Sequence, residues 1–215
     1  MFRSTTTIEE TILKREFNKW GIFELYKNFQ IIIRTSENKS ISVSQVEKTE
    51  NKKKSKDVKY ELENTVRSSL IRDRINKVHI CSNREQKDLA IRLQPIYSGI
   101  CIGEIRNKKF MLNLNFAEII ANQNSKLNYP YVILEEKGAK LVLYGRDIMG
   151  KSIISHNKEI KENQLLLILD KDKEVIGIGR SRYDNNLITQ IDKITIDNIQ
   201  DIGTHYLKSE NNHEI

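Results

Sequence analysis

Two short apolar runs that end in glycine and arginine constrain the fold of this chain most strongly. The first is Leu141–Asp147 and the second is Val175–Arg182. Aliphatic and β-branched residues favour strands, and glycine at the break of a strand lets another backbone approach closely. Arginine adds a flat, permanently charged fork that matches a phosphate group. The two runs together predict a small β-barrel that binds a polyanion.

Short strands at close spacing are predicted for the rest of the carboxy-terminal part. They cover Lys140–Tyr144, Ser152–Ile154, Gln164–Leu169, Val175–Ser181, Leu187–Ile191 and Asp201–Lys208. Polar turn residues separate some of them, at 171–173 and 183–186. Strands with little helix between them favour a barrel that closes on itself and leaves few exposed edges. We place the domain boundary near residues 128–134 and assign residues 134–215 to this barrel.

Residues 1–133 are predicted to form an α+β domain, with helices packed on an antiparallel sheet. Apolar periodicity predicts helices over residues 5–27 with a break at Gly21, over 83–94 and over 115–122. Strands are predicted over 29–33, 41–46, 77–81, 99–105 and 109–114. The last two strands pair as a hairpin across residues 106–108. The fold class of the chain is therefore α+β, with a β pseudo-barrel at its carboxy-terminal end.

Capping boxes mark three predicted helix starts. The pairs are Thr7 with Glu10 (or Thr6 with Glu9 in an alternative frame), Ser82 with Glu85, and Asn115 with Glu118. The helix over 83–94 is amphipathic. Its periodicity predicts that Leu89, Ala90 and Leu93 face the core.

The segment 47–59 interrupts this pattern. It holds six lysines, and Val58 is its one aliphatic residue. Such a segment cannot bury a core, so we predict a mobile loop or the tip of a long β-hairpin. Two interpretations stay open, a solvated insertion and a tether to an RNA backbone.

An excess of positive charge points to an anionic partner. The formal net charge is +7 and the isoelectric point is about 9.2. Nucleic acid, an anionic membrane or an acidic protein would each fit such a charge. No apolar run approaches the ~18 residues of a membrane span, and the amino terminus does not resemble a secretory signal. We therefore expect a cytoplasmic monomer with no membrane partner.

Metal, redox and cofactor chemistry are not expected. Cys81 and Cys101 lie in separate apolar runs and form no Cys-x-x-Cys pair, so both are predicted to be reduced packing residues. The four histidines share no metal-ligand spacing. The sequence Gly177-Ile178-Gly179 lies inside a predicted strand and lacks the third glycine and the following helix of a dinucleotide site.

A basic face on the barrel is predicted from the spacing of its cations. Arg180 and Arg182 lie two residues apart on a strand, so both point to one face, where they repel unless an anion lies between them or water hydrates both. Arg146 and Lys151 follow glycines, and a cation beside an approachable backbone suits phosphate. Ordinary turn glycines with solvated charges are the alternative. The candidate RNA-binding residues are Arg146, Lys151, Arg180, Arg182, Tyr183, Lys140, Lys193 and Lys208.

The aromatic and acidic residues near this face are interpreted separately. Tyr183 could stack on a base or pack at a strand end. Tyr144 is predicted to be a core residue. Asp147 follows a turn glycine, where aspartate commonly caps, and Asp201 is likewise a cap or turn residue. With no second acid or base beside them, we predict no catalytic residue.

The second domain resembles a PUA domain, an RNA-binding pseudo-barrel. The residues that carry the resemblance are Leu143–Asp147, Met149–Ile153 and Gly177–Arg180. With residues 99–105, 109–112 and 200–206 included, most of the chain is similar to the Nip-seven family of ribosome biogenesis proteins, and to an archaeal member. That resemblance implies a pre-PUA domain followed by a PUA domain, binding of uridine-rich RNA, a role in maturing the large ribosomal subunit and no enzymatic activity. It also implies ribosomal RNA and ribosome assembly proteins as partners.

Three functions are weighed on this basis. The first is a non-catalytic RNA-binding factor in large-subunit assembly. The second is an RNA-modifying enzyme, or its accessory subunit, with an appended PUA domain; the first domain shows no acid–base constellation and no cofactor loop to support it. The third is a protein adaptor whose charge serves solubility.

Overall fold

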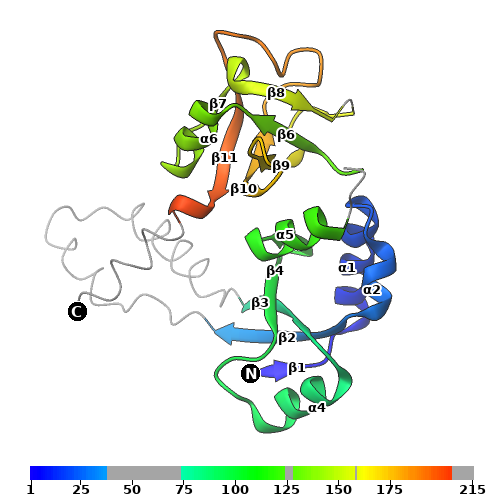
Figure 1. Ribbon diagram of the computed structural model, residues 1–215. Helices are drawn as coiled ribbons and strands as arrows, with labels where there is room; N and C mark the ends of the chain where they lie inside the picture. Colours follow the sequence, from blue (N-terminus) through cyan, green and yellow to red (C-terminus); the bar gives the residue numbers. More distant parts are fainter. Residues whose placement is uncertain (38–73, 124–127, 158, 205–215) are drawn as a thin grey trace, which may run out of the picture.

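Two sheets make up the protein, and each comes from one half of the chain (Figure 1). The computed structural model describes residues 1–37, 74–123, 128–157 and 159–204. Within these residues the first sheet has five antiparallel strands in the order β1-β2-β3-β4-β5, and the second has six in the order β7-β11-β10-β9-β6-β8. The predicted α+β class, with a β pseudo-barrel at the carboxy-terminal end, is confirmed.

The first sheet is built on the long pairing of its second and third strands. Its strands are β1 (Phe2–Arg3), β2 (Gln30–Glu37), β3 (Arg74–Cys81), β4 (Ile100–Arg106) and β5 (Lys109–Leu112). The predicted hairpin of β4 and β5 is confirmed, and it turns at Asn107 and Lys108 with φ values of 50° and 59°. Positive φ at both central residues matches the twist of the flanking strands. The predictions for residues 41–46 and 47–59 lie outside the described residues.

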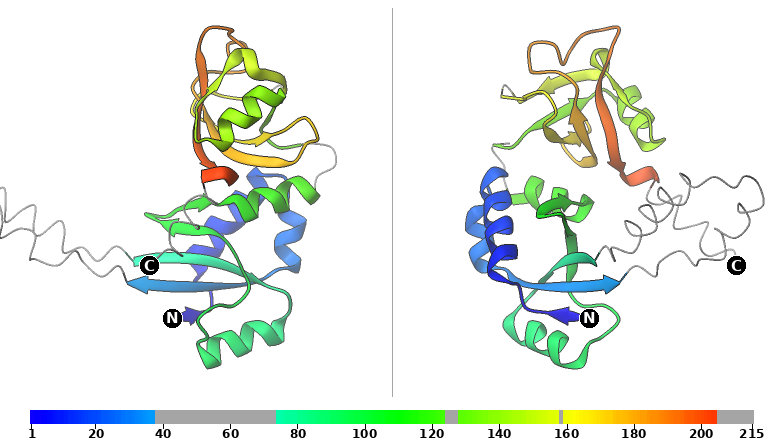
Figure 2. Two further views of the ribbon diagram at one scale, coloured as in Figure 1. Left: turned by 60° about the vertical axis from the view of Figure 1, so that its left-hand side comes forward. Right: turned by 180° about the vertical axis from the view of Figure 1, so that it is seen from behind.

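Helices cover both faces of this sheet, as the two views of Figure 2 show. One face carries α1 (Thr7–Lys19), α2 (Phe23–Asn28) and α5 (Leu114–Gln123), and the other carries α4 (Arg84–Leu93). The alternation of β2 follows this arrangement. Ile31 and Ile33 join the core under α1 and α5, whereas Ile32 packs with Ala90 of α4.

The helix starts differ in part from the predicted capping boxes. The alternative frame holds for α1, where the Thr6 hydroxyl accepts a hydrogen bond from the backbone N–H of Glu9. The start of α4 was assigned to the wrong residue, because Asn83 rather than Ser82 accepts from the backbone N–H of Gln86, at 2.8 Å. In α5 the cap is Asn113 in place of the predicted Asn115, and it accepts from the backbone N–H of Phe116 at 3.1 Å. Asparagine serves as well as serine in this role, so composition alone does not choose the frame.

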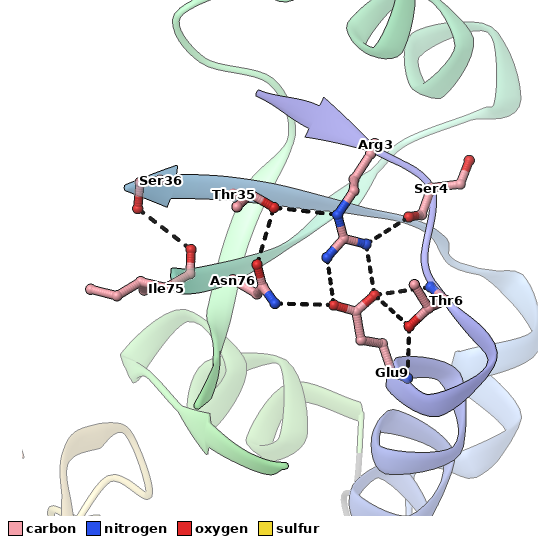
Figure 3. Close-up of polar contacts among 8 residues, drawn as sticks. All are labelled: Arg3, Ser4, Thr6, Glu9, Thr35, Ser36, Ile75 and Asn76. Carbon is pink, nitrogen blue, oxygen red and sulfur yellow. Dashed lines mark hydrogen bonds and ion pairs between the residues drawn. The ribbon is translucent and has the colours of Figure 1, made fainter. Parts of the chain in front are cut away.

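The amino terminus is held by a polar cluster between β1, α1, β2 and β3 (Figure 3). Two nitrogens of Arg3 donate to the two carboxylate oxygens of Glu9, at 2.8 and 2.7 Å. Asn76 also donates to Glu9, and the backbone N–H of Thr6 donates to the same carboxylate at 2.9 Å. Burial acts to raise the pKa of Glu9, but the bonds from Arg3 and Thr6 outweigh it and lower that pKa below its ordinary value.

The second sheet is antiparallel apart from one parallel pairing. Its strands are β6 (Tyr131–Leu134), β7 (Ile148–Met149), β8 (Ile153–His156), β9 (Leu165–Leu169), β10 (Val175–Ser181) and β11 (Ile194–Asp201). β6 pairs in parallel with β9, and β10 lies between β9 and β11. Since β6 belongs to this sheet, the second sheet takes in residues 131–133, which the predicted boundary placed in the first domain.

Two predicted strands of the barrel are wrong, since residues 140–144 lie in α6 (Glu136–Leu143) and its C-cap and residues 187–191 lie in turns. Of the strand predicted over residues 201–208, Asp201 ends β11 and residues 202–204 are helical, while residues 205–208 lie outside the described residues. A short 3₁₀ helix (Gly150–Ser152) also precedes β8. α6 covers the barrel, and the valine of its inner side, Val142, is fully buried against Ile148, Ile168 and Ile196. Packing on the barrel outweighs the strand preference of residues 141–144.

The two sheets are joined by a shared hydrophobic core. Phe116, Ala117 and Ile120 of α5 belong to the same buried cluster as Leu167 and Ile178 of the barrel. α5 therefore packs between the first sheet and the barrel. Among the described helices, none is long and apolar enough to span a bilayer.

Candidate nucleic-acid interface

The loop from α6 to β7 presents the first candidate cation, and its geometry follows from how α6 ends. The backbone N–H of Gly145 donates to the carbonyl of Val142 at 2.8 Å, and that of Arg146 donates to the carbonyl of Leu141 at 3.1 Å. Gly145 has a φ of 74°. This is a Schellman motif with glycine at the left-handed position that follows the C-cap. Gly145 therefore turns the chain so that Arg146 leaves the helix exposed to solvent.

The glycines of this region approach the protein's own chain. A Cβ on Gly150 would lie 2.2 Å from the carbonyl oxygen of Gln190, and one on Gly179 would lie 2.6 Å from Cγ2 of Ile196. A Cβ on Gly177 would lie 2.9 Å from the carbonyl oxygen of Gln200. The space that glycine leaves at these positions is filled inside the fold. The proposed role of Gly150 in opening the backbone to phosphate is therefore wrong, because no space remains there for a ligand.

Asn198 fixes the loop that carries Arg146, and sequence reasoning did not identify it. Its backbone N–H donates to Oδ1 of Asp147 at 2.9 Å. Its side-chain amide donates to the carbonyl of Val142 at 3.1 Å and also reaches the carbonyl of Arg146. Sequence reasoning could not assign this role, because Asn198 is 51 residues from Asp147 and the fold alone brings β11 beside the loop.

Arg180 lies on β10, and Arg182 follows directly after the strand ends at Ser181, so the prediction that both lie on the strand holds for Arg180 alone. Both arginines are exposed, and Ser181 between them is buried. Asp197 on β11 is directly opposite Arg180 in the register. The Arg182 guanidinium forms an ion pair with Asp197 and a second one with Asp147 at 3.4 Å. The hydrogen bond to Asp197 raises the pKa of Arg182 above its ordinary value.

These carboxylates change the argument for an anion between the two arginines. The charge of Arg182 is already met by Asp147 and Asp197, so its closeness to Arg180 requires no bound phosphate. Arg146 and Arg180 differ from it, since neither forms an ion pair with a described residue. Of these three arginines, Arg146 and Arg180 are therefore the ones whose charge is not met by a described carboxylate.

The remaining predicted cations have unequal surroundings. The Nζ of Lys193 lies 5.7 Å from the centre of the Tyr183 ring, so this ring is in contact with a cation of the protein itself. The carbonyl of Lys193 accepts from the backbone N–H of Gly150 at 3.0 Å, which brings Lys151 beside the same turn. Lys140 on α6 forms an ion pair with Glu136 at 2.8 Å, and this bond raises the pKa of Lys140. Lys208 lies outside the described residues.

An exposed tyrosine lies among these cations. Tyr144, the C-cap of α6, is 76% exposed, so its prediction as a core residue is wrong. It follows Lys140 by four residues and precedes Arg146 by two. The sequence contained a signal for this exposure. A lysine in the last turn followed by glycine, as at Lys140 and Gly145, is typical of a helix end, and it predicts that residue 144 lies at the end of a helix and not in a strand.

The acidic residues here have structural partners. Asp147 accepts from the backbone of Asn198 and from Arg182, and Asp201 caps the last described turn by accepting from the backbone N–H of Thr204 at 2.5 Å. The prediction that Asp201 is a cap is confirmed. Within the described ranges, no cluster of three histidine, cysteine or acidic side chains could hold a metal ion. What this surface offers is two unpaired guanidinium groups and one exposed aromatic ring.

The β pseudo-barrel covered by α6 matches the fold of a PUA domain. Residues 130–211 match the sequence profile of the UPF0113 PUA domain. The chain is also 33% identical over 121 residues to a UPF0113 protein of Archaeoglobus fulgidus, a match that covers 55% of this chain and 65% of the relative. The matched part thus spans slightly less than two thirds of that relative's length.

One solved structure agrees with this fold over nearly its whole length. A hypothetical protein of the archaeon Pyrococcus horikoshii superposes with a TM-score of 0.56 at 10% identity, over 94% of both chains. The likeness shows that both halves of the fold, and not the barrel alone, recur together. An archaeal box H/ACA sRNP complex gives a TM-score of 0.32 at 18% identity over 34% of this chain and 24% of that one. The Archaeoglobus relative supports the predicted archaeal origin.

Proposed function

We propose that the PUA domain binds RNA through the surface formed by Tyr144, Arg146 and Arg180. The observation that carries the proposal is the pairing state of the arginines: Arg146 and Arg180 are exposed and form no ion pair with a described residue, while Arg182 beside them is neutralised. Guanidinium groups bind phosphate oxygens, and an exposed tyrosine provides a stacking surface for an unpaired base. The excess of seven positive charges adds long-range attraction for a polyanion.

The biological role that we propose is assembly of the large ribosomal subunit, in the cytoplasm and without catalysis. It rests on the resemblance to the Nip-seven family, with ribosomal RNA and assembly proteins as partners. The proposal of no catalysis is supported by the two acidic residues of this surface, since Asp147 accepts a hydrogen bond from the backbone of Asn198 and Asp201 accepts one from the backbone of Thr204. Incubation with RNA followed by nucleoside analysis tests this part, because a modified nucleoside would favour the RNA-modifying alternative.

The binding surface is tested with an uridine-rich RNA oligonucleotide and fluorescence anisotropy. We expect the double substitution Arg146→Ala with Arg180→Ala to weaken binding roughly 10-fold or more at low salt, since two phosphate contacts are lost. Lys109→Ala is the matched control, because it removes an exposed cation from the first unit. Equal affinity of the double variant and the control would place the RNA elsewhere and overturn the proposed surface.

A further inference from the structure

Helix α4 uses only one side of its surface for packing. Ala90 is 2% exposed and joins Phe2, Ile32 and Cys81 in a small cluster beneath the helix. Leu89 and Leu93, which were predicted to face the core, are instead 37% and 66% exposed. A helix that buries an alanine and leaves two leucines in water has an unpartnered apolar face.

The outward face of α4 is ordered along the helix. Residues that follow one another by four and three positions lie on one line of an α-helix, and Glu85, Leu89 and Arg92 have this spacing. Asp88 lies on one side of this line and Leu93 on the other. We call these five residues the α4 stripe. All five are exposed, and a groove of about 300 Å³ beside Leu89 and Leu93 continues the apolar surface toward Pro95.

Acidic and basic side chains of the α4 stripe lie on opposite sides of Leu89 along the helix. Acidic groups lie toward the start of the helix, at Glu85 and Asp88, and the basic group lies toward its end, at Arg92. Asp88 is 3.9 Å from Arg84 of the same helix. Neither Glu85 nor Arg92 forms an ion pair with any residue in the described ranges. An antiparallel copy of the same stripe would place Arg92 opposite Glu85 twice, with the two-fold axis between Asp88 and Leu89 and the two Leu89 side chains beside it.

We propose that the α4 stripe is a homodimer interface, in which it pairs antiparallel with the α4 stripe of a second copy of this chain. A two-fold interface requires a surface that complements itself, and acid, leucine and base in that order do so. An unrelated partner would not require this order. The stripe thus replaces the monomer expected from the sequence with a dimer.

The position of α4 makes this dimer compatible with the barrel's own surface. α4 lies at the end of the first unit that is farthest from the second sheet, as both figures show (Figures 1 and 2). Pairing through α4 places the two barrels at opposite ends of the dimer. Neither Arg146 nor Arg180 is covered by it, so dimerisation and RNA binding can be measured separately.

The test is a charge exchange followed by sedimentation equilibrium of the full chain over a range of concentrations. We expect Glu85→Arg and Arg92→Glu each to raise the dimer dissociation constant roughly 10-fold or more, because each creates two like-charge contacts across the two-fold axis. The double variant Glu85→Arg with Arg92→Glu restores both pairs and the wild-type constant. Lys109→Glu, an exposed charge reversal in the first unit, is the control.

A second measurement does not depend on charge. With Cys101 changed to serine and Cys81 buried, Leu89→Cys supplies one accessible thiol per chain next to the two-fold axis. We expect a short bis-maleimide to give a covalent dimer in this variant and none in Glu118→Cys, an exposed position on α5. A wild type that stays monomeric at its highest soluble concentration would overturn the proposal, as would a dimer that the single exchanges leave unchanged or that the double exchange fails to restore.

Discussion

The two glycine–arginine segments of the barrel look alike in sequence and differ in structure. Val175–Ser181 forms β10, a buried central strand, whereas Leu141–Leu143 ends helix α6. The glycines differ in the same way, since Gly179 makes room for a neighbouring strand and Gly145 supplies a left-handed backbone turn. The arginines divide differently: Arg182, just after β10, is paired with carboxylates, whereas Arg146 and Arg180 form no ion pair with a described residue. A shared local pattern thus serves packing in one place and exposure in the other.

The largest difference is expected when both glycines are given side chains. In Gly179→Val the first added carbon already falls 2.6 Å from Ile196 inside the barrel, so the free energy of unfolding should fall by about 3 kcal/mol. Urea denaturation measures this loss. If Gly179→Val unfolds no more easily than Gly145→Ala, the strand does not need its glycine for close packing.

The next effect compares the buried ion pair of Arg3 and Glu9 with the exposed ion pairs of Arg182. Glu9 is 6% exposed and accepts two hydrogen bonds from Arg3, so Arg3→Ala should lower the free energy of unfolding by about 2 kcal/mol. Arg182→Ala on the exposed barrel face should lower it by less than about 1 kcal/mol. Thermal denaturation of the two variants compares them directly. Equal losses would show that burial does not separate the two ion pairs.

The same pair predicts a pH dependence. The pKa of Glu9 is lower in the folded protein than in the unfolded chain. The ionised carboxylate therefore stabilises the fold at pH values above the unfolded pKa, and this contribution is lost as pH falls through the folded pKa. Wild-type stability should therefore decline in acid more steeply than that of Glu9→Gln, which has no carboxylate to protonate at this position. Parallel declines of the two proteins would contradict this assignment.

A smaller effect is expected at the end of α6. Gly145→Ala places a side chain at a φ of 74° and should cost about 1 kcal/mol, because left-handed backbone is strained for residues with a Cβ. Gly145→Asn is the matched control, since asparagine tolerates this conformation better. Alanine and asparagine variants of equal stability in urea would argue against strain at this turn.

The smallest expected effect separates the arginines in RNA binding. Arg146→Ala should weaken RNA affinity several-fold, by about 1 kcal/mol, and Arg182→Ala by less, because Arg182 already holds two carboxylates. Anisotropy titrations at one salt concentration rank the two. A greater loss from Arg182→Ala would mean that RNA displaces its carboxylates, and the comparison between paired and free arginines would fail.

Sequence reasoning succeeded where neighbouring residues decide the outcome. The break at Gly21, the hairpin turn at Asn107 and Lys108, and strand β10 follow from rules that act over a few residues. It failed for α6, because strand preference in Leu141–Tyr144 was read without weighing Gly145 as a helix end. It failed again at Leu89 and Leu93, whose periodicity shows a common face but not which side of α4 meets the sheet.

The sequence, through local periodicity and composition, determined the described helices and strands of the first unit apart from β1, together with the α+β class and the positive charge. The tertiary structure alone decided which cations are free. The carboxylates of Arg182 come from residues 35 and 15 positions away, and the exposure of Arg146 depends on how Asn198 of β11 holds the loop. Local rules fix what each segment forms; the electrostatic state of a side chain depends on which distant segments the fold brings beside it.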